Sequence, residues 1–496
     1  MSLRLRLDDR TQFPFDGDIS ALGDAKQLGL LITFLWLVGV PASAQTPTGS
    51  QAPDEAASAP EGSVAPSALK WDVSQRSRYA TLRNQFRPGL SGDDQALVFR
   101  TTFRVEVPVG PTNVVAEFQD ARAYLTDDQS NVSTALVNAI DLLQAHVRFG
   151  DRTATRAFVP KVQAGRFSME LGSGRLVAQE AYRDVTRTFT GALLQWRHVG
   201  QSAITAFAVL PVLTLPDDRV ALLDNHVQRD REHLNSRFWG VLFERPTFWL
   251  GMHGEAYVFR LDEHDVAGKR ETRDRAIWTG GGRLFRAAAR RKYDVDVEAA
   301  GQMGRAHASS APTDQRALDV AAWYLHGSTG FTWSPSWVPR LGVEYDYGSG
   351  DTSPVDGKWN RFDSLFGNRR VDLGPTSIYG ALGRENIDTV GIRMSAAPTS
   401  RLDAFAAYRW VGLAAAADAF ASTGLRDSSG RAGRDGGRQL DVRARVWLVP
   451  RLVRVEAGVT HLLAGRFMRD APNAMHQGNT TFLYSDITYS VGSRQK

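Results

Sequence analysis

The 496-residue sequence predicts an all-β protein: a transmembrane antiparallel β-barrel of about 18 strands, or about 16 if two weakly patterned runs are not strands. Three observations predict this class. Short runs alternate between apolar and polar residues, the connections between them alternate between short and long, and the amino terminus resembles a secretion signal.

The alternation of side chains is clearest between positions 97 and 107. One face of this run carries Leu97, Phe99, Phe103, Val105 and Val107, and the other carries Val98, Arg100, Thr102, Arg104 and Glu106. A period of two residues is typical of a β-strand. Because a charged face buried in a soluble core would be very costly, the pattern indicates a strand with lipid on one side and water on the other.

The connections predict the topology of the barrel. Short ones, most of them containing proline or glycine, fall at 108–111, 200–202, 245–247, 335–339, 398–400 and 450–451. Long ones fall at 125–140, 169–188, 212–236, 349–386, 413–438 and 464–480. We therefore expect short periplasmic turns, long extracellular loops and both termini in the periplasm. The runs near 161–168 and 318–333 are the weakly patterned ones.

The amino-terminal region predicts export from the cytoplasm. An apolar run at 28–40 follows Lys26 and precedes the small-x-small pattern Ala42-Ser43-Ala44. The run is shorter than the roughly 18–20 residues of a membrane-spanning helix, so residues 1–44 are interpreted as a signal peptide. We expect residues 45–70 to be a disordered periplasmic leader, 71–491 the outer-membrane barrel and 492–496 a periplasmic tail.

Catalytic and cofactor signals are poor. The chain has no cysteine, which excludes disulfides and thiolate metal sites, and it contains neither a G-x-S-x-G nor a G-x-x-x-x-G-K-[ST] motif. His226 and His233 lie in an acidic loop without a metal-binding spacing. Calcium on Asp346, Asp351 and Asp356 is a weaker interpretation than a simple loop turn. We expect no enzyme activity, no cofactor, no resident metal and no nucleic-acid partner.

Arginine is the main chemical feature of the chain. Only seven of its 59 basic residues are lysine, although a GC-rich coding sequence could explain the bias itself. Position along the strands is more informative, because alternation places several arginines on the lumen side: Arg100, Arg104, Arg148, Arg443 and Arg445. Guanidinium groups bind carboxylates in fork geometry, so these five are candidate contacts for an anionic solute. Acids such as Glu106 and Glu117 share the lumen side, and each arginine could instead pair with a neighbouring acid.

An ordered set of motifs resembles the alginate export family of proteobacterial outer-membrane porins. The motifs are Arg76-x-Arg78-Tyr79, 84–88, Gly165-Arg166-Phe167, 171–177, 182–185, Arg187-Thr188-Phe189, 349–351, 362–367, Thr460-His461 and Gly465-Arg466-Phe467. The resemblance runs from about residue 71 to 491. One departure is the carboxyl terminus, where Gly-Ser-Arg-Gln-Lys follows Val491 instead of a final aromatic residue.

The resemblance implies an eighteen-stranded barrel with an arginine-rich constriction, to which the matching motifs would contribute Arg166, Arg175, Arg183 and Arg187. It implies passive passage of an anionic exopolysaccharide, such as an alginate-like polyuronate, out of the cell. The alternative is an uptake porin for small carboxylates or aromatic acids. Expected partners are the anionic solute, outer-membrane lipid with lipopolysaccharide, and periplasmic export-scaffold proteins, around a monomeric barrel.

Overall fold

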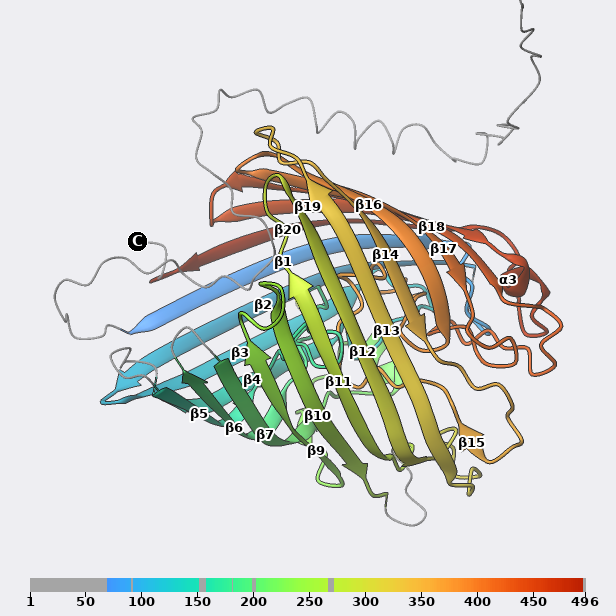
Figure 1. Cartoon of the computed structure of the whole chain (residues 1–496), viewed down its shortest axis with the longest axis horizontal. Helices are drawn as coiled ribbons and strands as arrows, with labels where there is room; N and C mark the ends of the chain where they lie inside the picture. Colours follow the sequence, from blue (N-terminus) through green and yellow to red (C-terminus); the bar gives the residue numbers. More distant parts are fainter. Residues whose placement is uncertain are drawn as a thin grey trace, which may run out of the picture. The chain divides into compact units, whose positions relative to one another are not determined.

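The computed structural model describes residues 69–90, 92–150, 158–180, 182–198, 202–265 and 272–493. The expected signal peptide and nearly all of the expected leader lie outside these residues. The described chain forms one closed antiparallel sheet (Figure 1). Among the described residues, no helix is long and apolar enough to cross a membrane.

Eighteen strands form the barrel, as predicted. They are β1 (Lys70–Arg83), β2 (Asp93–Val109), β3 (Thr112–Tyr124), β4 (Asn138–Phe149), β5 (Phe158–Phe167), β6 (Phe189–His198), β7 (Ser202–Leu213), β9 (Ser236–Arg245), β10 (His253–Glu263), β11 (Ala276–Arg286), β12 (Lys292–Ala306), β13 (Leu318–Thr332), β14 (Arg340–Gly348), β16 (Ile387–Thr399), β17 (Leu402–Gly412), β18 (Asp435–Val449), β19 (Val453–Ala464) and β20 (Thr480–Gly492). The two-residue strands β8 (Arg231–Glu232) and β15 (Lys358–Trp359) and the short helices α2 (Arg219–Leu223) and α3 (Arg466–Asp470) lie in loops.

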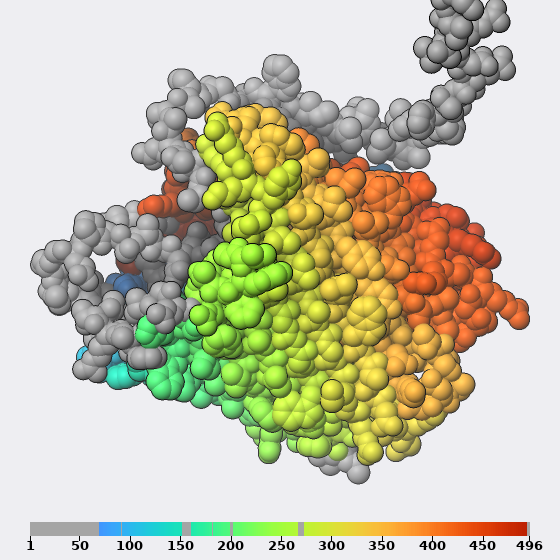
Figure 2. Space-filling view, viewed as in Figure 1, coloured from blue at the N-terminus to red at the C-terminus, as the bar shows by residue number. Residues whose placement is uncertain are grey.

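Pairing between the first and last strands closes the barrel. β1 pairs with β20 in antiparallel register, with Arg78 opposite Asp486. Elsewhere each barrel strand pairs with its neighbours in sequence, which is why colour changes gradually across the outer surface in Figure 2. The two weakly patterned runs are both full strands, β5 and β13, so the larger strand number is confirmed.

The burial of side chains confirms the inside–outside alternation. On β2, Thr102 and Glu106 are buried on the lumen side, whereas Phe99 and Phe103 are exposed on the outer face. Short turns and long loops alternate along the chain as predicted. The side of the strand that faces the lumen is therefore the one that the alternation of residues predicted.

Two long loops fold into the barrel. The 168–188 loop joins β5 to β6, and the 349–386 loop joins β14 to β16. They pair with each other inside the lumen: Phe366 N donates to Leu176 O at 2.9 Å, and Ala178 N donates to Phe366 O at 3.1 Å. Tyr379 of the second loop is fully buried and stacks on Phe482 of β20, with ring centroids 5.5 Å apart. Buried side chains of these loops pack against the inner side of the strands in two hydrophobic clusters.

Candidate functional site

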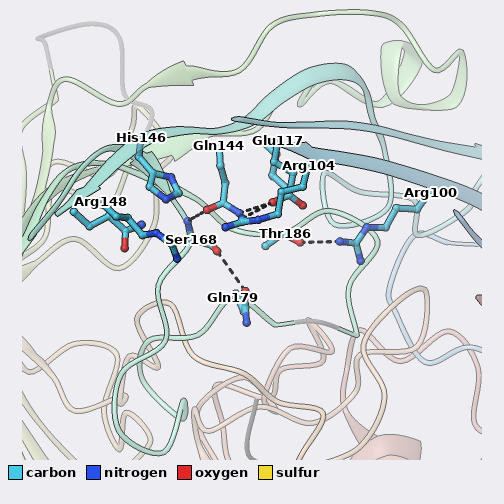
Figure 3. A pocket seen from close by; sticks show the side chains of 11 residues that line it. Arg100, Arg104, Glu117, Gln144, His146, Arg148, Ser168, Gln179 and Thr186 are labelled. Atoms are coloured by element: carbon cyan, nitrogen blue, oxygen red, sulfur yellow. Dashed lines mark hydrogen bonds and ion pairs between the residues drawn. The ribbon is translucent and has the colours of Figure 1, made fainter. Parts of the chain in front are cut away.

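A cavity of about 330 Å³ lies between the wall formed by β2 to β5 and the 168–188 loop (Figure 3). In Figure 3 side chains from the wall and from the loop point toward one another. The wall contributes Arg100, Arg104, Glu117, Leu143, Gln144, His146, Arg148 and Gln163, and the loop contributes Ser168, Gln179 and Thr186. Three of the nine predicted arginines, Arg100, Arg104 and Arg148, therefore meet in one cavity.

The charges in the cavity are only partly balanced. Arg104 lies 3.2 Å from Glu117, and Arg148 lies 2.8 Å from Glu106. Arg100 has no carboxylate within 4 Å among the described residues; its Nη2 donates to Thr186 Oγ1 at 3.3 Å, and its buried Nε has no hydrogen-bond partner there. An arginine with unused donors is a binding group for an anion, because guanidinium stays charged at any physiological pH.

Neutral polar side chains surround the arginines. Gln144 Nε2 donates to Glu117 at 2.6 Å, and Gln144 Oε1 accepts from Ser168 N at 3.2 Å. Ser168 Oγ donates to Gln179 Oε1 at 3.3 Å. Leu143 is the one apolar residue of the eleven that line the cavity. The lining therefore suits a ligand with both carboxylate and hydroxyl groups.

Arg175 of the 168–188 loop is neutralised by acids across the lumen. It lies 3.1 Å from Asp296 and 2.9 Å from Glu298, both on β12, and 2.9 Å from Asp372 of the 349–386 loop. Its side chain is buried. Burial opposes the charge on Arg175, but the surrounding acids, Asp372 foremost, raise its pKa well above the ordinary value. Its observed contacts link the loop to the opposite wall.

The other two arginines of this loop also lie away from the cavity lining. Arg183 is 3.7 Å from Glu180. Arg187 donates to the carbonyl oxygen of Phe366 and has no carboxylate within 4 Å among the described residues. Burial, and then the nearby charge of Arg183, lower the pKa of Arg187 to about 9. Within the described chain, Arg187 is thus a second guanidinium without an acidic partner, one residue from Thr186.

The remaining predicted arginines lie on barrel strands and are paired with acids. Arg166 of β5 lies 2.7 Å from Glu232 of β8. Arg443 and Arg445 of β18 share Asp403 of β17, the second at 2.8 Å. For these three arginines the second possibility named above holds: each pairs with a neighbouring acid.

The cavity also contains residues that the sequence analysis did not select. Gln144 and His146 are on the lumen side of β4, so the same alternation that identified Arg148 could have found them. Ser168, Gln179 and Thr186 lie in a loop without periodicity, and no pattern in the sequence indicated their position.

The side chains of one group lie close enough together to hold a metal ion. Ligand atoms of His326, Asp346 and Asp372 lie within 4.8 Å of one another. However, Arg409 is 3.3 Å from Asp346, and both Arg175 and Arg384 contact Asp372. Guanidinium groups already neutralise these carboxylates, so the donor set fits an ion-pair network better than a cation.

Comparison with solved structures shows which known barrels share this fold. The Pseudomonas aeruginosa outer membrane protein OpdK matches with a TM-score of 0.52 at 12% identity, covering 86% of this chain and 99% of OpdK. OccK5 (OpdH) of the same organism matches with a TM-score of 0.51 at 10% identity, covering 86% and 98%. A structure of OpdK with vanillate gives a TM-score of 0.51 at 12% identity, covering 86% and 98%. At these identities the likeness concerns the fold.

The closed eighteen-stranded sheet, its exposed apolar outer face and a match to a family model over residues 68–481 together define an integral outer-membrane β-barrel channel. Residues 68–481 match the family described as alginate export, and the chain belongs to that family. The resemblance seen in the sequence motifs is thereby confirmed. Comparison with curated protein sequences gives no match.

Proposed function

We propose that this channel passes an anionic, uronate-containing polysaccharide out of the cell, and that the cavity beside β2 to β5 is a binding station on its path. The observation that carries the proposal is Arg100, a guanidinium without a carboxylate partner among the described residues, in a polar cavity that also contains Arg104 and Arg148. Membership of the alginate export family supports the direction of transport.

The lining of the cavity favours a sugar acid over an aromatic acid. A uronate residue carries one carboxylate for Arg100 and several hydroxyl groups for Gln144, Gln163 and Gln179. An aromatic acid would need apolar surface for its ring, and Leu143 is the one apolar residue of the lining. Vanillate in the OpdK structure is a ligand of OpdK, whose likeness to this chain is one of fold.

The acids of the cavity make the binding reversible. Glu117 and Glu106 already contact Arg104 and Arg148, so a solute carboxylate competes with them for the guanidinium donors. Conduction requires sites that bind and also release. We therefore infer weak, exchangeable binding by a monomeric barrel without catalysis, with synthesis and a periplasmic scaffold supplying the polymer.

The test is single-channel recording of the refolded protein in a planar bilayer. We expect chloride to be preferred over potassium, and long polyuronate oligomers to block the current saturably while the monomer does not. Arg100→Glu with Arg104→Glu should reverse the selectivity and abolish the block. A matched control is Arg305→Glu with Arg438→Glu, two exposed arginines outside the cavity. Unchanged selectivity in the cavity variant, or equal block by small carboxylates, would reject the proposal.

A further inference from the structure

Three short turns lie next to one another on the rim opposite the long loops. Turn 246–252 joins β9 to β10, turn 287–291 joins β11 to β12, and turn 333–339 joins β13 to β14. These strands are consecutive neighbours in the sheet. In Figure 2 the yellow-green and gold segments of the second and third turns project at the upper edge of the molecule. We call the three turns the basic rim; by the usual barrel topology they face the periplasm.

Ring and backbone contacts hold the basic rim together. His253 of β10 stacks on Phe285 of β11 with centroids 4.8 Å apart. Arg291 N donates to Thr332 O at 2.8 Å, which links the second turn to the end of β13. Phe331 and Trp333 pack edge to face at 5.3 Å. The three turns therefore form one continuous surface.

Five cations of this surface have no acidic partner in the part of the chain that the structure describes. Arg245, Arg286, Arg290, Arg291 and Lys292 are all exposed, and none has a carboxylate within 4 Å among the described residues. Four of them fall within the seven residues 286–292. Most lumen arginines, in contrast, are paired with acids. This concentration of positive charge creates a positive potential at the rim.

Exposed apolar side chains flank the cations. Phe248, Trp249 and Leu250 at the tip of the first turn are 61%, 57% and 72% exposed. In the third turn Trp333 and Trp337 are also exposed. A surface of aromatic rings beside guanidinium groups can receive a ligand with apolar faces and carboxylate edges, which describes a chain of sugar acids.

We propose that the basic rim is a capture site for the acidic polysaccharide at the periplasmic mouth, distinct from the cavity in the lumen. The inference rests on the proposed function. Lys292 has the strand parity of Asp294 and Asp296, which face the lumen, so the cations extend from the turn toward the interior. Rim charge would raise the rate at which the polymer is captured, and the cavity would hold it afterwards.

The test measures block by polyuronate oligomers added to one side of the bilayer at a time. The variant Arg290→Gln/Arg291→Gln/Lys292→Gln removes three rim charges. A control variant, Arg229→Gln/Arg431→Gln/Arg438→Gln, removes three exposed charges from the loop side. Because the chain has no cysteine, Ser428→Cys in the 413–434 loop reports the orientation of each channel through an impermeant thiol reagent.

We expect the rim variant to lower the association rate from the periplasmic side about tenfold at low salt, with the dissociation rate unchanged. Addition from the extracellular side should give wild-type rates, and so should the control variant on the periplasmic side. Trp249→Ala should shorten the dwell time of periplasmic encounters. Salt should reduce the difference between wild type and rim variant, because screening weakens steering.

Three other outcomes would contradict the proposal that the basic rim captures the polymer. Equal rates in rim variant and wild type would show that the rim charges do not attract the polymer. Loss of block from both sides alike would assign the effect to the lumen. If the variant changed only the dependence of insertion on phosphatidylglycerol in the bilayer, the rim would be a lipid anchor, as aromatic belts are. Absence of block in the wild type would instead reject the proposed function itself.

Discussion

The carboxylate of Asp184 accepts a hydrogen bond from Nη2 of Arg76 at 2.7 Å, and this contact joins the 168–188 loop to the first strand of the barrel. The second oxygen of Asp184 lies 3.3 Å from Arg78, which also contacts Asp486 of β20 at 3.1 Å. The Arg78 guanidinium further lies over the ring of Tyr182, 4.1 Å from its centroid. The loop that bounds the cavity is thus fastened where β1 and β20 close the barrel.

Asp184→Asn should destabilise the barrel, because it leaves buried guanidinium charge without its partner. Breaking a buried ion pair on one side costs about 3–5 kcal/mol. The matched control is Asp319→Asn, which breaks a pair with Arg305 whose side chains are 77% and 76% exposed and should cost about 0–1 kcal/mol. Urea unfolding of the refolded protein measures both. Equal losses in the two variants would contradict a structural role for Asp184.

The dependence of the free energy of unfolding on pH in acid should also differ in Asp184→Asn. Burial alone would raise the pKa of Asp184, but the guanidinium groups of Arg78 and Arg76 hold the pKa below its ordinary value. A lowered carboxyl pKa contributes stability above the pKa of the unfolded chain, about 4, and this stability is lost as pH falls through the folded value. Wild-type stability should therefore fall more steeply below about pH 4 than that of the variant.

Arg175→Gln should loosen the 168–188 loop and increase conductance. The substitution leaves Glu298 without its guanidinium partner and disconnects the loop from β12 and from Asp372. Single-channel recording should show larger and noisier currents with a lower preference for chloride. Arg175→Lys should not restore the wild-type current, because one ammonium group cannot satisfy three carboxylates in fork geometry. Wild-type currents in both variants would contradict the prediction that Arg175 holds the 168–188 loop in place.

The stability of the 214–235 loop, which contains Asp230, should depend on pH near neutrality. Asp230 N donates to Asp141 Oδ2, and its own Oδ1 accepts from Leu215 N at 2.9 Å and from Asn138 Nδ2 at 2.8 Å. Burial, and the neighbouring carboxylate of Asp141, raise the pKa of Asp230 to about 7. A raised carboxyl pKa means that the folded protein binds the extra proton, so the loop loses stability as pH rises from about 4 to about 7.

Amide hydrogen exchange at Leu215, corrected for the intrinsic rate, measures this effect. Protection should be greater at pH 5.5 than at pH 8 in the wild type. In Asp230→Asn it should be nearly independent of pH, because an amide reproduces the protonated carboxyl group. A pH dependence that persists in the variant would assign the effect to another group, with Asp141 the carboxylate in direct contact and Arg166 and Glu232 the next charged groups.

The sequence by itself determined the barrel, because alternation along a strand is a local property. The parity of Leu97 to Val107 identified both faces of β2, and the connection lengths indicated the order of turns and loops. The same alternation predicted that Arg100, Arg104 and Arg148 face the lumen. The alternation along a strand could not decide whether an arginine contacts a solute or an acid. That depends on the register of the neighbouring strand, which places Asp403 opposite Arg445.

Only the tertiary structure decided where the long loops go. Arg175 meets Glu298 more than 120 positions away, and Asp184 meets Arg76 across 108 positions. Such contacts form because folding brings charges of opposite sign together at buried positions, where unpaired charge is costly. No local pattern encodes them. The cavity beside β2 to β5 is the space that these long-range contacts leave open.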